Sequence, residues 1–242
     1  MEKIEKNHVL TEGCESLGIQ LSKKQEEQFE NYYNILIEWN QVINLTGITD
    51  YDEVMRKHFV DSLSIVKAID INKCSALLDV GTGAGFPGLP LKIVFPHLRV
   101  VLLDSLNKRI NFLNEVTAKL GLTGIETIHG RAEDYARQKD YREQFDIVVS
   151  RAVANLASLS EYCIPYTKNN GLFISYKSGN VDTEYKEAKK AVFLLGGREK
   201  EVVKFMLPGS DIERSLVVIE KVKSTPKTYP RKAGLPAKEP IK

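Results

Sequence analysis

Four glycines that follow a short apolar run are the residues of this chain best suited to bind a ligand. The run at 76–80 predicts a buried strand, and Gly81, Gly83, Gly85 and Gly88 come directly after it. Glycine lets the backbone turn tightly and lets a ligand approach where a Cβ would obstruct it. A helix predicted from residue 89 offers unpaired N–H groups at its start, which favour a polar or anionic group. The pattern predicts a cofactor loop over residues 81–85, Thr82 included.

Two kinds of cofactor fit such a loop. Residues 83–88 match the GxGxxG pattern of dinucleotide binders, and Asp104 follows about 20 residues later, as that pattern requires. Asp79 favours S-adenosylmethionine instead. A carboxylate at the strand end can bind the ammonium group of that cofactor, through water or N–H groups, and would repel a pyrophosphate. We therefore expect S-adenosylmethionine, with a nicotinamide cofactor as the alternative.

Two further loops are expected to contact the same cofactor. Asp104 and Ser105 end the second predicted strand, where the Asp104 carboxylate can accept hydrogen bonds from both ribose hydroxyls. Its alternative role is to cap the helix that follows. The loop at 130–134 comes after the third strand and in this kind of fold borders the adenine. Glu133 or Asp134 could equally cap the next short helix.

A mostly parallel sheet is needed to position these loops. Apolar runs predict strands at 76–80, 99–103, 125–128, 145–149 and 172–176, with helices at 89–95, 107–120, 156–166 and 183–195. Such alternation implies βαβ units with helices on both faces. Residues 200–206 and 215–222 are two strands joined by a turn, so they should pair antiparallel. The sequence predicts an α/β, Rossmann-like class I S-adenosylmethionine-dependent methyltransferase fold that ends in an antiparallel hairpin.

The two ends of the chain differ from this centre. The first 70 residues read as a helical extension, where Ser22 and Gln25 form a capping box and the helical spacing of Tyr32, Tyr33 and Trp39 indicates core. The last twenty residues are basic and proline-rich, and we expect them to have little structure alone. We divide the chain into an N-terminal helical segment (1–70), a methyltransferase domain (71–222) and a tail (223–242).

The motifs together resemble the bacterial ribosomal RNA small-subunit methyltransferase G family, also called glucose-inhibited division protein B. The resemblance covers nearly the whole chain, with the elements in the same order. It rests on the segments NLT at 44–46, KHFVDS at 57–62, DVGTGAGFPG at 79–88, DS at 104–105, RAE at 131–133, SRA at 150–152 and YPRKAGLP at 229–236.

This resemblance implies methylation of a guanine N7 in 16S ribosomal RNA. It also carries cofactor contacts onto Gly81, Phe86, Ala132, Glu133 and Arg151. Guanine N7 has a free lone pair and no proton, so the reaction needs no general base and depends on positioning.

Arg151 and Arg131 are the candidate catalytic residues. Arg151 follows the fourth strand at the carboxyl edge of the sheet, where ligands bind. We expect it to hold the target guanine, through O6 or a phosphate, or the cofactor carboxylate; the alternative is a surface ion pair with Asp146 or Glu161. Arg131 is a second candidate of the same kind. His58 and Asp61 share one helical face towards the cofactor loop, and we expect His58 to be structural.

Composition limits the remaining possibilities. Three dispersed cysteines and no metal-ligand spacing predict neither a metal site nor disulfides, and favour a reducing cytoplasm. No apolar run predicts a membrane span. We expect a monomer whose partner is 16S ribosomal RNA or the small ribosomal subunit. The net charge of +2 alone does not require RNA, but the tail could neutralise phosphates. Alternative functions are a methyltransferase acting on a protein or small molecule, or a nicotinamide-dependent oxidoreductase.

Overall fold

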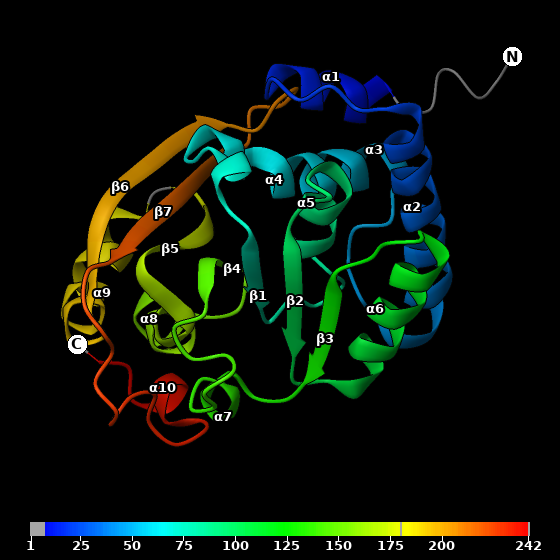
Figure 1. Ribbon diagram of the computed structural model, residues 1–242. Helices are drawn as coiled ribbons and strands as arrows, with labels where there is room; N and C mark the ends of the chain where they lie inside the picture. The colour runs from blue at the N-terminus through cyan, green and yellow to red at the C-terminus, as the bar shows by residue number, and fades with distance from the viewer. Residues whose placement is uncertain (1–7, 180, 242) are drawn as a thin grey trace, which may run out of the picture.

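The computed structural model describes residues 8–179 and 181–241, and within these ranges seven strands form one sheet (Figure 1). The strand order is β3-β2-β1-β4-β5-β7-β6. Strands β1 to β5 are joined by parallel pairings, whereas β7 runs antiparallel to both of its neighbours, β5 and β6. The bounds are β1 (Ala76–Val80), β2 (Arg99–Asp104), β3 (Ile125–His129), β4 (Phe145–Arg151), β5 (Thr167–Ser178), β6 (Gly197–Met206) and β7 (Glu213–Lys221). The predicted fold class, including the antiparallel end, is confirmed.

Helices cover both faces of the sheet, because successive side chains of a strand point to opposite faces. The N-terminal helices are α1 (His8–Ser16), α2 (Lys23–Ile43), α3 (Tyr51–Val54) and α4 (Asp61–Leu63); the others are α5 (Gly88–Val94), α6 (Asn107–Lys119), α7 (Ala132–Tyr135), α8 (Leu156–Cys163), α9 (Asp182–Leu194) and α10 (Leu235–Lys238). Leu77 and Leu102 pack into a core with α2, α5 and α6, whereas Leu78 and Val101 pack into a second core with α8 and α9. The first core continues into the N-terminal helices.

The N-terminal helices bring a second group of side chains to the glycine loop. The predicted Ser22–Gln25 capping box is present at the start of α2. Tyr32 is fully buried, and its hydroxyl donates to the carbonyl oxygen of Ala84 in the loop. Between α3 and α4 the chain forms a π-helical turn over Met55–Val60. Such turns contain one extra residue, and they recur at functional sites. Here the turn carries His58 beside Phe86.

The C-terminal segment differs from expectation, because residues 223–241 are packed against the protein. Arg142 donates to the carbonyl oxygens of Thr225 and Tyr229 at 2.8 and 3.0 Å. Arg231 pairs with the buried Glu161 at 2.7 Å. Figure 1 shows this segment, in red, running past α8 and α7 and forming α10. The expectation of little structure did not hold, because the basic composition of the segment does not show that Arg142 and Glu161 bind it.

Among the described residues, no helix is both long and apolar enough to cross a lipid bilayer.

Candidate functional site

A cleft at the carboxyl ends of β1, β2, β3 and β4 consists of three adjoining compartments. The first, of about 410 Å³, lies at the ends of β1, β2 and β3 and beside α7, and Glu133 and Tyr162 line it. The second, of about 360 Å³, contains the glycine loop and shares Gly81 and Asp104 with the first. The third, of about 510 Å³, is joined to the second through His58, Arg151 and Ala152. We call them the loop-130 compartment, the glycine-loop compartment and the arginine compartment.

Asp79 holds the glycine loop in place from beneath. Its Oδ2 accepts hydrogen bonds from the Thr82 hydroxyl at 2.7 Å and from the Gly88 amide at 2.8 Å. Gly88 also packs so closely that an added Cβ would lie 2.5 Å from Leu102. Gly81, Gly83 and Gly85 all have positive φ angles, of 69°, 61° and 91°. The loop therefore requires glycine for its conformation as well as for access.

Asp79 itself is fully buried and lines none of the three compartments. Its carboxylate therefore does not open directly into the cleft, and the expected contact with an ammonium group through water or N–H groups stays a prediction. Burial raises the pKa of Asp79 to about 6, although its hydrogen bonds with Thr82 and Gly88 act in the opposite direction. Its Oδ1 is buried and has no hydrogen-bond partner among the described residues. Asp79 is thus a supporting residue with one unsatisfied oxygen under the loop.

Asp104 lies where the loop-130 and glycine-loop compartments meet. Its Oδ2 accepts from the Gly83 amide at 2.9 Å and from Arg109 at 3.2 Å, and its Oδ1 accepts from the Leu106 amide at 2.9 Å. A carboxylate has about four acceptor positions, so three are already used. Asp104 can therefore bind one ribose hydroxyl without rearrangement, rather than the two expected. The bond to Leu106 is not the helix cap considered as the alternative, because Leu106 is itself the N-cap residue and precedes the first turn of α6. Ser105 lines both compartments beside it.

Arg131, Ala132 and Glu133, from the loop expected to border the adenine, line the loop-130 compartment. Tyr166 fixes this loop by donating to the Ala132 carbonyl at 2.6 Å. Glu133 is buried, and its Oε1 accepts from the Gly234 amide at 2.7 Å. Arg131 lines this compartment alone and not the compartments around Arg151. The expectation that the two arginines share one role is therefore not supported by their positions.

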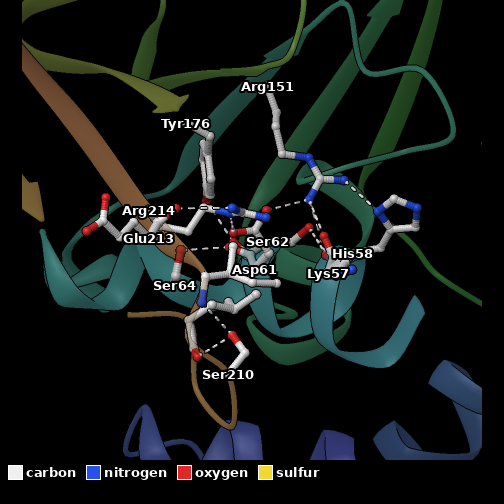
Figure 2. Close-up of polar contacts among 12 residues, drawn as sticks. Lys57, His58, Asp61, Ser62, Ser64, Arg151, Tyr176, Ser210, Glu213 and Arg214 are labelled. Carbon is white, nitrogen blue, oxygen red and sulfur yellow. Dashed lines mark hydrogen bonds and ion pairs between the residues drawn. The ribbon is translucent and has the colours of Figure 1, made fainter. Parts of the chain in front are cut away.

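Arg151 is held from one side by Asp61, as Figure 2 shows. Its Nη1 lies 3.0 Å from Asp61 Oδ2, and the other oxygen of Asp61 lies 2.9 Å from Nε of Arg214 on β7. Asp61 is 4% exposed, so one buried carboxylate holds two arginines. The alternative ion pairs considered for Arg151 do not form, because Asp146 pairs with Lys168 and Glu161 with Arg231.

His58 and Phe86 complete the surroundings of Arg151. The two rings stack with centroids 4.6 Å apart, and the Arg151 guanidinium lies 5.1 Å from the Phe86 centroid. Burial and the nearby Arg151 lower the pKa of His58 to about 3. A neutral His58 can accept from Arg151 through Nδ1 at 3.4 Å and donate through Nε2 to the Thr46 hydroxyl at 2.8 Å. This arrangement fits the structural role expected for His58.

Ala152, Tyr176 and Arg214 were not recognised from the sequence as residues of the site. Ala152 has φ of +57°, an unusual conformation for a residue with a Cβ, and it lines two compartments. Arg214 and Tyr176 also line the arginine compartment, and the Tyr176 hydroxyl donates to the Ser62 carbonyl at 2.7 Å. The only available signal was the charged residue Arg214, two positions before the apolar run at 216–219.

Nearly the whole chain is similar in sequence to the proteins of a single family. The family model described as rRNA small subunit methyltransferase G matches residues 25–217. The chain belongs to this family. A protein named ribosomal RNA small subunit methyltransferase G from Lachnoclostridium phytofermentans is 58% identical over 235 residues, covering 97% of each chain. A protein of the same name from Clostridium perfringens (strain 13) is 50% identical and covers 97% of this chain and 98% of its own. The expected family and methyltransferase activity are confirmed, and the nicotinamide alternative is wrong.

Solved structures agree with this family at the level of the fold. The YcgJ protein from Bacillus subtilis has a TM-score of 0.51 at 13% identity and covers 69% of this chain and all of its own. A putative transferase from Pyrococcus horikoshii has a TM-score of 0.53 at 12% identity, covering 68% of this chain and 63% of its own. Family membership gives S-adenosylmethionine as the cofactor.

The residues present fit this cofactor. Gly83 lines the glycine-loop compartment, and an added Cβ there would meet nothing within 4 Å, so the loop leaves open space in the cleft. Asp104 and Glu133 add carboxylate oxygens in the two compartments where hydroxyl and amine donors of an adenosine are expected.

Proposed function

We propose that this enzyme transfers the methyl group of S-adenosylmethionine to N7 of a guanine in 16S ribosomal RNA, and that the guanine enters the arginine compartment. The charge of that compartment supports the proposal. Four cationic residues line it, Lys57, Arg151, Lys177 and Arg214, against the two carboxylates Asp61 and Glu184. An RNA strand carries one negative phosphate per nucleotide, so a cationic compartment next to the cofactor loop suits this substrate.

Positioning accounts for the chemistry without a proton acceptor. When bound, S-adenosylmethionine supplies an electrophilic methyl group on a positively charged sulfur. Guanine N7 has a lone pair and no proton to lose, so no residue needs to act as a base. His58, at the junction of the two compartments, is neutral and already engaged with Thr46 and Arg151. The residues at this junction therefore bind and orient rather than move protons.

Arg151 is the residue proposed to contact the target. It lines both the glycine-loop and the arginine compartments, so it borders donor and acceptor together. Its Nη1 is directed to Asp61 and to the carbonyl oxygen of Lys57, which fixes the guanidinium plane. A fixed arginine can bind the O6 oxygen of guanine or a neighbouring phosphate. Arg131, in contrast, is proposed to contact only the adenosine side of the cleft.

We propose that the enzyme works in the cytoplasm as a monomer. One chain supplies residues to all three compartments, so the site is formed without a second copy. The natural substrate is proposed to be the small subunit or its 16S RNA.

Transfer of tritium from labelled S-adenosylmethionine to 30S subunits that lack the native modification tests the proposal. Label recovered as 7-methylguanosine from one fragment of 16S RNA is expected. Absence of label from both subunits and naked 16S RNA, with cofactor binding intact by calorimetry, would contradict the RNA substrate and leave protein or small-molecule acceptors.

A further inference from the structure

The C-terminal segment, residues 223–241, forms part of the loop-130 compartment. Gly234 lines that compartment together with Glu133, Arg131 and Tyr162. The Gly234 amide donates to Glu133 Oε1 at 2.7 Å, although the two residues are 101 positions apart. Glu133 Oε2 accepts no hydrogen bond from the described residues, so the bond to Gly234 orients the carboxylate and leaves one oxygen for another donor.

Contacts behind the compartment hold Gly234 in this position. Arg231, three residues earlier, donates to Glu161 from its amide at 2.6 Å and from Nη2 at 2.7 Å. Glu161 is fully buried in α8. Two residues after Gly234, the Pro236 carbonyl accepts from the Ser158 hydroxyl at 2.6 Å. The segment is thus fixed to α8 on both sides of the residue that reaches the cleft.

We propose that residues 223–241, packed against α8, form one side of the adenosine site. Packing of this segment and binding of S-adenosylmethionine each increase the equilibrium constant of the other. The docked segment fixes Glu133 and closes one side of the compartment, so the cofactor meets an oriented acceptor. A cofactor that prefers the docked form must favour docking by the same free energy, since such coupling is reciprocal. The inference depends on the cofactor assignment and not on RNA as the methyl acceptor.

The first test uses calorimetry with the full chain and no RNA. Arg231→Ala removes the anchor, and we expect it to weaken binding of S-adenosylmethionine and S-adenosylhomocysteine by roughly tenfold, within the usual range of coupling between sites. Lys232→Ala removes the same charge from the neighbouring exposed position and should change affinity by less than about twofold. Equal affinities of the Arg231→Ala variant and the unmodified protein would overturn the proposal.

Steady-state kinetics separate this positioning role from loss of folding. We expect Arg231→Ala to raise the KM for the cofactor while kcat changes little. A variant that merely unfolded in part would lower kcat at an unchanged KM. Because Arg231→Ala leaves Glu161 buried without its partner, the double variant Arg231→Ala/Glu161→Gln is measured in parallel, with the same loss of affinity expected.

Hydrogen exchange of the unmodified protein gives an independent test. Addition of S-adenosylhomocysteine should slow exchange of the backbone amides at 231–235, in addition to those of the loops at 81–85 and 130–134. Unchanged exchange in this segment at saturating ligand would contradict the proposed coupling even if RNA methylation were normal.

Discussion

Nη1 of Arg151 lies 3.0 Å from Oδ2 of Asp61, and this pair links the fourth strand of the sheet to the N-terminal helices. Asp61 also pairs with Arg214, so one buried carboxylate positions both guanidinium groups beside the proposed reacting junction. Loss of either Arg151 or Asp61 should therefore disturb the position of the other side chain.

Replacement of Arg151 by alanine should lower methyl transfer by roughly 100-fold, the usual cost of removing one fixed electrostatic contact at a reacting centre. The fold should survive, because Asp61 retains Arg214. Single-turnover transfer to 30S subunits measures the effect. Arg198→Ala, which removes an exposed arginine on β6, is the matched control. Near-normal turnover of Arg151→Ala would exclude the proposed role.

Replacement of Asp61 by asparagine should cost both stability and activity. Two arginines would lose their buried anion, and breaking such a pair typically costs about 3 kcal/mol. Urea unfolding measures the stability, and transfer kinetics measure the loss of Arg151 orientation. If the double variant Asp61→Asn/Arg151→Ala were no slower than Arg151→Ala, Asp61 would act through Arg151. Additive losses in rate would argue for an independent role of Asp61.

Asp79 should make the protein less stable as the pH rises through the weakly acidic range. Its pKa is about 6 in the folded protein and about 3.9 in an unfolded chain. Between these values the folded protein retains a proton that the unfolded chain has released, so the contribution of Asp79 to stability falls as the pH rises. Asp79→Asn should remove this slope. Urea unfolding of both proteins from about pH 4 to pH 7 measures the difference, and parallel curves would contradict it.

The conformation of Ala152 should make this position tolerant of glycine and intolerant of branched residues. Its φ of +57° costs a residue with a Cβ about 1–2 kcal/mol, which glycine avoids at the expense of greater freedom when unfolded. We expect Ala152→Gly to change stability by less than about 1 kcal/mol and to retain activity. Ala152→Val should lose more than about 1 kcal/mol and should slow transfer by displacing Arg151. Thermal unfolding and kinetics test both variants.

The rate of methyl transfer should be nearly independent of pH between about 6.5 and 8.5, because no general base is required. His58 has a pKa of about 3, so it stays neutral over this range. Single-turnover rates at saturating RNA measure the profile. A clear inflection near neutral pH that disappears in His58→Gln would instead assign proton transfer to this histidine.

Local patterns in the sequence predicted the fold well where a residue type favours a single kind of local structure. The strand, glycine loop and helix at 76–94 follow from apolar runs and from positions that need glycine. Strand β5 was predicted at 172–176 but begins at Thr167, because the polar residues at 168–170 conceal its first half.

The site could be predicted only in part, because its partners come from distant positions. The loop residues were found from their place after strands, whereas Arg151 was found from its place at a strand end together with the family resemblance. Arg214 could not be linked to Asp61, 153 positions away, since no spacing rule connects a helix with the last strand. The contact of Gly234 with Glu133 was hidden for the same reason. The composition of the tail predicted little structure for this segment alone and gave no sign that it packs against the rest of the protein.

The position of Gly234 in the chain has a consequence for how the enzyme matures during synthesis. The sheet is complete once β7 has been made, yet the loop-130 compartment still lacks the residue that orients Glu133. Since translation proceeds from the N-terminus, a nascent chain can form its framework before it can form its complete cofactor site. The enzyme therefore gains its full site only after residue 234 has left the ribosome that made it.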